Sequence, residues 1–227
     1  ISDQVEAGVD IPTDGEVRRE NYIHYHCRHL NGFDFEELTE KSLRNGAYSA
    51  HLPTVRGPIS TNGRFLVRDW EAARACTDRP VKVTLPGPLT IADTVVDDWY
   101  GDNARFGRDL ADALNEEILA LAAAGCEHIQ IDEPLFARRP EAALEYGMEN
   151  LERAFAGCPS TVTRTMHMCC GYPDRLDNPD YPKADPSAYG QIAQAIDESS
   201  IDAVSIEDAH RHNPLQLLEM FSRTTVV

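Results

Sequence analysis

The chain has 227 residues, of which 42% are hydrophobic, so it is long enough for one large α/β domain or for part of a larger protein. Its 38 acidic side chains outnumber the 21 basic ones, and the net charge of -17 argues against nucleic acid or an anionic membrane as a partner. No apolar run is long enough for a membrane span, and no signal-peptide pattern opens the sequence. We therefore expect a soluble protein. The six cysteines have no regular spacing typical of a disulfide framework, so we expect the protein to work in the reducing cytoplasm.

Hydrophobic patterning, turn signals and prolines predict strands that alternate with helices along the chain. The first residues resemble the last turns of a helix closed by Gly8, and a long excursion over 31–53 follows the next helix. The expected strands are 9–12, 54–60, 81–85, 128–132, 161–169, 201–206 and 224–227, and the expected helices are 17–30, 67–76, 104–124, 141–155, 186–197 and 215–221.

Polar side chains gather where these strands end. Asp132 and Glu133 close the strand at 128–132, and they are either structural acids bonded to backbone amides or parts of a site. Parallel βα units bring strand ends to one face, which is the functional face of a barrel. No glycine-rich nucleotide motif follows any strand. We therefore expect an α/β fold, a (β/α)₈ TIM barrel that lacks the first βα unit and the end of the last, with 1–227 as a single catalytic domain incomplete at both ends.

The segment TVTRTMHMCC at 161–170 is the strongest candidate for a metal site. His167 and Cys169 are two residues apart at a strand end, so their side chains project from the same face. Glu207 ends the next expected strand, and a parallel sheet would bring its carboxylate beside them. Imidazole, thiolate and carboxylate form a zinc-type ligand set. Cys170 points the opposite way, and we interpret it as a buried small hydrophobe.

The other histidines admit two interpretations. His24, His26 and His29 share one expected helix, but their spacing does not gather three rings on one face, which favours a solvated or packed face over a metal site. His210 and His212 follow the expected carboxylate ligand and either contact substrate or cap the following helix. We retain His210 as a candidate catalytic residue.

Six short motifs occur in order: DGE at 14–16, GFDF at 32–35, LPGPLTI at 85–91, IDEP at 131–134, HMC at 167–169 and SIE at 205–207. Together they resemble the carboxy-terminal catalytic barrel of cobalamin-independent methionine synthase, a family of the methionine synthase and uroporphyrinogen decarboxylase superfamily. The likeness extends from about residue 4 to the end of the chain. Single tripeptides are weak signals, whereas six in order at barrel strand ends are specific.

The resemblance implies a methyltransferase, of the methyl-folate–homocysteine S-methyltransferase type, with Zn²⁺ as cofactor. His167, Cys169 and Glu207 match three of the family's zinc ligands, and the fourth, a cysteine, would lie beyond the last residue of this chain. Glu16 matches an acid that binds the amino group of homocysteine. Asp132 matches a second acid near the same substrate, and we treat it as both substrate-binding and catalytic.

One departure concerns the methyl donor, because this chain has Thr94 where the family has a tryptophan that packs against folate. Three functions stay open. The first is methyl transfer from a methyl-folate-type donor to homocysteine in methionine biosynthesis. The second is a zinc thiol transferase with another electrophile or thiol, as in epoxyalkane:coenzyme M transferases, and the third is a metal-free barrel resembling uroporphyrinogen decarboxylase. The expected partners are small molecules, and a homo-oligomer or a separate N-terminal domain is a further expectation.

Overall fold

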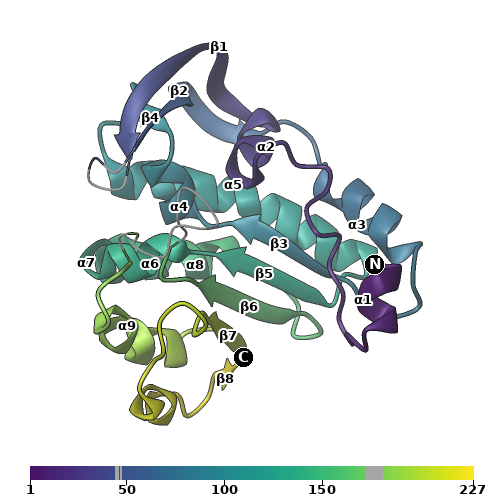
Figure 1. The fold of residues 1–227 in the computed structure, drawn as a ribbon. Coiled ribbons are helices and arrows are strands. Elements are labelled where there is room, and N and C mark those ends of the chain that lie inside the picture. The colour runs from purple at the N-terminus through teal and green to yellow at the C-terminus, as the bar shows by residue number, and fades with distance from the viewer. Residues whose placement is uncertain (44–45, 47, 172–180, 182) are drawn as a thin grey trace.

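The computed structural model of the chain describes residues 1–43, 46, 48–171, 181 and 183–227. At its centre lies a five-stranded sheet in which all neighbouring strands run parallel (Figure 1). An isolated parallel bridge between Thr13 and Lys82 continues this sheet at its β3 edge. In spatial order the strands are β3 (Lys82–Pro86), β5 (His128–Asp132), β6 (Thr163–Met168), β7 (Ala203–Ile206) and β8 (Thr225–Val226).

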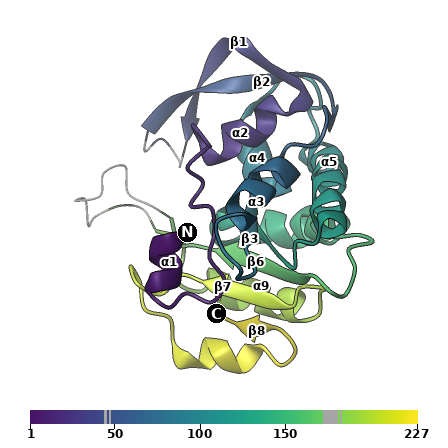
Figure 2. The same cartoon turned by 90° about the vertical axis from the view of Figure 1, so that its right-hand side faces the viewer.

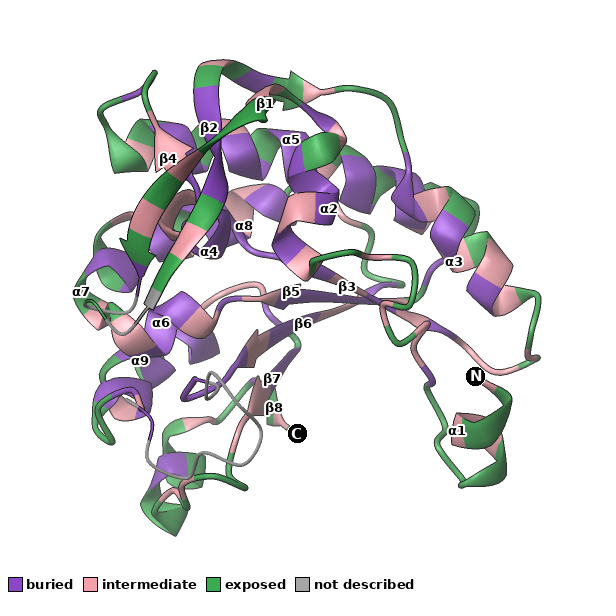
Figure 3. Ribbon diagram, turned by 45° about the horizontal axis from the view of Figure 1, so that its top comes forward, coloured by how far each residue is buried: buried purple, intermediate pink, exposed green. Residues whose placement is uncertain are grey.

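The two faces of the central sheet differ because successive side chains of a strand point to opposite sides. On β5, Ile129 and Ile131 are fully buried in the hydrophobic core, which lies under the helices (Figure 3). Gln130 and Asp132 alternate with them and belong to the other face. Helices therefore cover the apolar face, and titratable side chains gather on the face that would line a barrel.

The longest helix, α5 (Asn103–Ala124), shows why the helix predictions succeed. Asp102 caps it by accepting bonds from its first backbone amides, and Gly125 ends it in the left-handed conformation at φ 100°. These two signals agree with the expected helix at 104–124. The other helices are α1 (Ser2–Glu6), α2 (Tyr22–Arg28), α3 (Leu66–Arg74), α4 (Pro88–Asp93), α6 (Pro134–Arg138), α7 (Pro140–Ala142), the π-helix η1 (Ala143–Gly147), α8 (Met148–Ala154), α9 (Ala188–Asp197) and the 3₁₀-helix η2 (Leu215–Met220).

A second sheet lies apart from the first and covers one side of the molecule (Figure 2). It consists of the antiparallel pair β1 (Leu30–Leu43) and β2 (Tyr48–Thr61), with β4 (Val96–Asp97) parallel to β2. The expectation that 54–60 is a strand of the barrel was wrong, because this segment pairs with β1 instead. Gly32 permits the pairing: it has φ 95°, and a Cβ there would lie 2.8 Å from the carbonyl oxygen of Gly57.

Two further expectations near the start of the chain are corrected. Residues 9–12 form no described strand, and this edge contributes only the bridge at Thr13. The helix expected at 17–30 is shorter, because Asn21 caps α2: its side chain accepts bonds from the amides of Ile23 and His24 at 2.9 and 3.0 Å. The cap makes Tyr22 the first helical residue, and this placement matters for the site.

Candidate functional site

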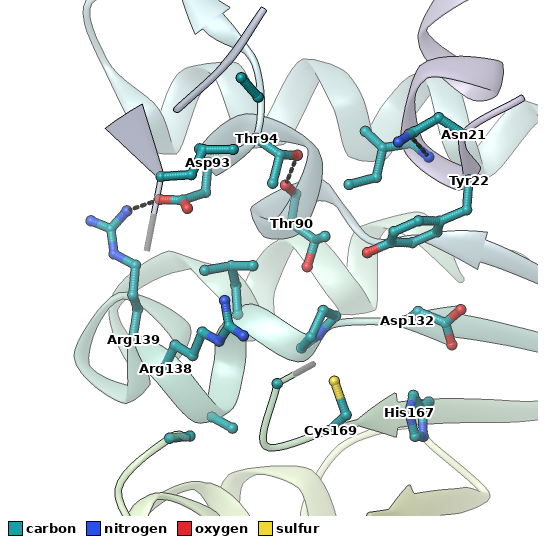
Figure 4. Close-up of a pocket in the computed structure, with 18 of the residues that line it drawn as sticks. Asn21, Tyr22, Thr90, Asp93, Thr94, Asp132, Arg138, Arg139, His167 and Cys169 are labelled. Carbon is teal, nitrogen blue, oxygen red and sulfur yellow. Dashed lines mark hydrogen bonds and ion pairs between the residues drawn. The ribbon is translucent and has the colours of Figure 1, made fainter. Parts of the chain in front are cut away.

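A cavity of about 1070 Å³ opens at the carboxyl ends of β5 and β6, below the hairpin formed by β1 and β2. Glu16, Asp132, His167 and Cys169 all line it, so four residues predicted from the sequence meet in one space. Figure 4 shows the last three of them. The carboxyl end of a parallel sheet is where barrel enzymes bind their substrates. The remaining lining comes mainly from α2, α4, α6 and the hairpin.

Glu16 is held in a strained turn at the edge of this cavity. It is the single non-glycine residue with positive φ, at 57°, among the residues that the structure describes. Arg19, whose side chain is 3% exposed, donates to Oε1 of Glu16 at 2.9 Å, and the hydroxyl of Thr84 donates to the same oxygen at 2.7 Å. One carboxylate oxygen is thus committed to the protein, which leaves the other as an acceptor for a ligand.

The adjacent acids Asp132 and Glu133 have separate roles. Glu133 is fully buried, and it accepts bonds from the amides of Leu89 and Thr90 at 2.9 and 3.0 Å and from the Thr90 hydroxyl at 2.6 Å. It therefore caps the start of α4, and burial raises its pKa to about 8. A Cβ at position 87 would collide with this carboxylate, so Gly87 must be glycine. Of the two interpretations, the structural one holds for Glu133, while Asp132 lines the cavity.

Asp132 ends a chain of hydrogen bonds across the polar face of the sheet. Lys82 donates to Oε1 of Gln130 at 2.7 Å, and Nε2 of Gln130 donates to Oδ1 of Asp132 at 2.6 Å. Burial and the nearby carboxylate of Glu16 raise the pKa of Asp132 to about 7, against the opposing effect of the bond from Gln130. Asp132 is therefore poised to gain or lose a proton near neutrality.

The imidazole and thiol expected to bind metal lie together on the cavity floor (Figure 4). Nδ1 of His167 lies 3.0 Å from the hydroxyl oxygen of Ser205, which leaves Nε2 as the ring nitrogen for another ligand. Burial lowers the pKa of His167 and raises the pKa of Cys169, while the charge of Arg138 acts on the thiol in the opposite direction. A neutral imidazole beside a thiol suits zinc.

The carboxylate of Glu207 is bonded to other groups and does not complete a metal site with His167 and Cys169. Its Oε2 accepts a bond from the thiol of Cys170 at 2.8 Å, and its Oε1 accepts from the backbone amide of His210 at 2.6 Å. In the part of the chain that the structure describes, no three His, Cys, Asp or Glu side chains are gathered closely enough to hold a metal ion. The donor types fit zinc, but the expected set is only partly assembled. Cys170 is buried, as expected, yet its thiol acts as a hydrogen-bond donor.

The other histidines are mostly packed or surface groups. His26 is fully buried, and His29 stacks on Phe65 with ring centroids 4.0 Å apart, so the packed interpretation holds for both. His24 lines the cavity from α2. Nδ1 of His210, the candidate catalytic residue, lies 3.1 Å from Oε1 of Glu207. His210 therefore contacts this carboxylate and is not part of the cavity lining.

The sequence alone did not single out Arg19, Tyr22 or Arg138, although all three shape the site. Arg19 follows Glu16 by three residues, and that spacing was a usable signal for an ion pair. Tyr22 lines the cavity as the first residue after the cap of α2. The guanidinium of Arg138 lies against Gly171, close to Cys169, and no pattern in the sequence indicates this contact.

The fold matches solved structures. A B12-independent methionine synthase from Shewanella sp. W3-18-1, in complex with selenomethionine, is 34% identical with a TM-score of 0.90 over 100% of this chain and 66% of that chain. A methyltransferase from Methanosarcina mazei is 14% identical with a TM-score of 0.51 over 71% of this chain and 46% of that chain, so it shares the fold alone. The first match confirms the expected α/β fold of TIM-barrel type. No helix in the described ranges is both long and apolar enough to cross a membrane.

Two methionine synthases align with nearly the whole chain. The methionine synthase of Saccharolobus solfataricus is 30% identical over 224 residues, which cover 97% of this chain, and that of Sulfolobus acidocaldarius is 26% identical over 225 residues, which cover 98%. The chain spans 60% of the length of each of these relatives. The family described as cobalamin-independent synthase, catalytic domain, matches residues 1–227. The chain therefore belongs to the cobalamin-independent synthase family and carries its catalytic domain.

Proposed function

We propose that this protein transfers a methyl group from a methyl-folate-type donor to the thiol of homocysteine, giving methionine, with zinc as the metal that activates the thiol. Family membership supports the proposal. One observation carries the proposal: two acids and an imidazole–thiol pair line the same cavity. The acids are Glu16 and Asp132, and the pair is His167 and Cys169. These groups suit a small amino acid held by its ammonium group at one end and its sulfur at the other.

The acids bind the ammonium group in this proposal. Protein donors occupy Oε1 of Glu16 and Oδ1 of Asp132, so each carboxylate keeps one oxygen for substrate. An ammonium group has three N–H donors and can bond to both acids at once. Arg19 fixes the orientation of Glu16 before substrate arrives, which lowers the entropy cost of binding.

The residues that would hold zinc are His167, Cys169 and Glu207, through a ring nitrogen, a thiolate and a carboxylate. Bound zinc would convert a thiol whose ordinary pKa is about 8.5 into a thiolate near neutral pH. Ser205 orients His167 so that Nε2 remains for the metal. Glu207 would have to leave Cys170 to join them, and His210, which bonds to Glu207, acts in this proposal by positioning that carboxylate.

We further propose that residues 1–227 form one catalytic barrel unit that works in the reducing cytoplasm. All six cysteines are free thiols, and a reducing compartment keeps such thiols available for metal binding. The parallel sheet and the cavity at its carboxyl edge support the proposal of one unit.

A related zinc thiol transferase with another electrophile or thiol is the second candidate, because of one observation. Thr94 lines the cavity where the family resemblance leads us to expect a tryptophan, and its hydroxyl donates to the carbonyl oxygen of Thr90 at 2.6 Å. This short side chain offers no planar surface on which the ring of a folate could stack.

The test combines metal analysis of the full-length protein with a methyl-transfer assay on homocysteine and methyl-tetrahydrofolate. We expect about one zinc per chain, consistent with a single site, and formation of methionine. Zinc without methionine would instead support the second candidate. Absence of zinc would contradict both and leave the metal-free barrel resembling uroporphyrinogen decarboxylase.

A further inference from the structure

Three hydroxyl groups belong to the described residues that line the cavity, those of Tyr22, Thr90 and Thr94, and all three lie on the wall opposite Cys169 (Figure 4). The Thr90 hydroxyl donates to Glu133 at 2.6 Å, and the Thr94 hydroxyl donates to the carbonyl oxygen of Thr90 at 2.6 Å. The hydroxyl of Tyr22 has no hydrogen-bond partner among the described residues. It is therefore the hydroxyl on this wall that is available to a bound molecule.

The fold holds Tyr22 firmly in this position. Asn21 caps α2 directly before it, and the backbone carbonyl oxygen of Tyr22 accepts a bond from Nδ1 of His26, which lies 2.8 Å away and is fully buried. The ring extends from α2 into the cavity above Asp132 and Cys169 (Figure 4). A hydroxyl placed by a capped helix needs little reorganisation to bind a ligand.

The surroundings of Tyr22 keep its hydroxyl protonated. Burial raises the pKa of Tyr22, and the negative charges of Asp132 and Cys169 raise it further. A phenolate beside these groups would be repelled, so Tyr22 acts as a neutral hydrogen-bond donor and not as a base.

Displacement at a methyl carbon requires the attacking and leaving atoms to lie in line on opposite sides of that carbon. Under the proposed function, the thiol would be held on the floor formed by His167 and Cys169, so the leaving atom would lie toward the wall that carries Tyr22. Resting on the proposed function, we propose that Tyr22 is a catalytic residue whose hydroxyl donates a hydrogen bond to the folate nitrogen from which the methyl group departs.

The step balances without an additional reactant. Homocysteine loses its thiol proton, a sulfur–carbon bond forms, and the nitrogen–carbon bond breaks with its electron pair left on nitrogen. That nitrogen finally takes up one proton from solvent, which equals the proton lost by the thiol. Tyr22 stabilises the electron pair as it develops and remains neutral throughout.

The test compares two methyl donors in the zinc-loaded full-length protein with homocysteine as acceptor. Methyl-tetrahydrofolate has a poor nitrogen leaving group, whereas methyl iodide has a good one that needs little hydrogen bonding. We expect Tyr22→Phe to slow transfer from methyl-tetrahydrofolate by about 10- to 100-fold and to change transfer from methyl iodide by less than about twofold. Tyr25→Phe is the matched control, because Tyr25 lies on the same helix but donates to Asp69 at 2.6 Å, outside the cavity lining.

Two measurements separate this inference from its premises. Calorimetric binding of methionine to Tyr22→Phe should match the unaltered protein, which shows that the site is intact. Equal slowing with both donors, or no slowing with either, would overturn the role of Tyr22. An unaltered protein that methylates homocysteine from neither donor would instead contradict the proposed function, and transfer from methyl iodide alone would contradict the folate-type donor and this inference with it.

Discussion

The two halves of the cavity differ in how far they are assembled. In the acid half, Glu16 is already fixed by Arg19 and Thr84, and Asp132 by Gln130. In the metal half, His167 and Cys169 share the cavity, but Glu207 is bonded to Cys170. A buried arginine and an amide can satisfy carboxylates permanently, whereas a thiolate and a carboxylate repel each other until a cation lies between them. Under the proposed function, this difference means that the substrate-binding acids are preorganised and that zinc would complete the other half.

The largest effect should come from removing the thiol of the metal half. Cys169→Ser is expected to lower zinc content to less than about a tenth and methyl transfer by at least about 100-fold, because a serine hydroxyl is a far poorer zinc ligand than a thiolate. Elemental analysis and the methionine assay measure both. Cys76→Ser is the control, since Cys76 is exposed. Full zinc content in Cys169→Ser would show that the metal half has been placed wrongly.

A change in the acid half should separate substrate binding from metal binding. Glu16→Gln is expected to raise the KM for homocysteine about 30-fold, since it removes a charged acceptor from the ammonium group, while zinc content stays unchanged. Glu20→Gln serves as the control, because the Glu20–Arg28 pair is solvent-exposed. Loss of zinc together with the rise in KM would mean that the two halves are not independent.

The helix α2 lines the cavity and carries the buried His26, which makes the stability of the fold sensitive to pH. Burial lowers the pKa of His26 from 6.5 to about 3, so protonation favours the unfolded chain. The free energy of unfolding should therefore fall as pH drops below 6.5, by about 1.4 kcal/mol per pH unit from this group, down to its folded pKa.

Urea unfolding at several pH values measures this slope. His26→Leu should reduce the slope of unfolding free energy against pH by about 1.4 kcal/mol per pH unit, the contribution of one proton. His212→Gln should leave the slope unchanged, because the side chain of His212 is 88% exposed. If His26→Leu keeps the full slope, another group controls the acid sensitivity of the fold.

The smallest effect should come from the bond that holds Glu207. Cys170→Ala removes the thiol donor and should strengthen zinc binding by about fivefold, since a net hydrogen bond of about 1 kcal/mol no longer competes with the metal. Competition with a zinc-binding dye measures the affinity, and Cys158→Ala, at a half-buried position in the loop after α8, is the control. Weaker zinc binding in Cys170→Ala would show that this thiol supports the metal site instead of restraining Glu207.

Local patterns were sufficient for much of the fold. The cap Asp102 and the terminal Gly125 define α5 within the sequence itself, and the two-residue period of a strand is enough to place His167 and Cys169 on one face. Parallel strand order likewise predicted that Asp132, at the end of β5, would share one face with His167 near the end of β6. In each case the deciding interaction lies within a few residues along the chain or follows from parallel strand order.

Only the tertiary structure decided the rest. The assignment of 54–60 to the hairpin depends on its pairing with β1, and the structural role of Glu133 depends on Leu89, which lies 44 residues earlier in the chain. The bond between Cys170 and Glu207 joins residues 37 positions apart, and the hydroxyl of Tyr22 faces the cavity because α2 packs above a strand end that follows much later in the sequence. Such contacts form between segments that are distant in the sequence and meet only in the folded chain. The periodicity or spacing within either segment therefore cannot predict them.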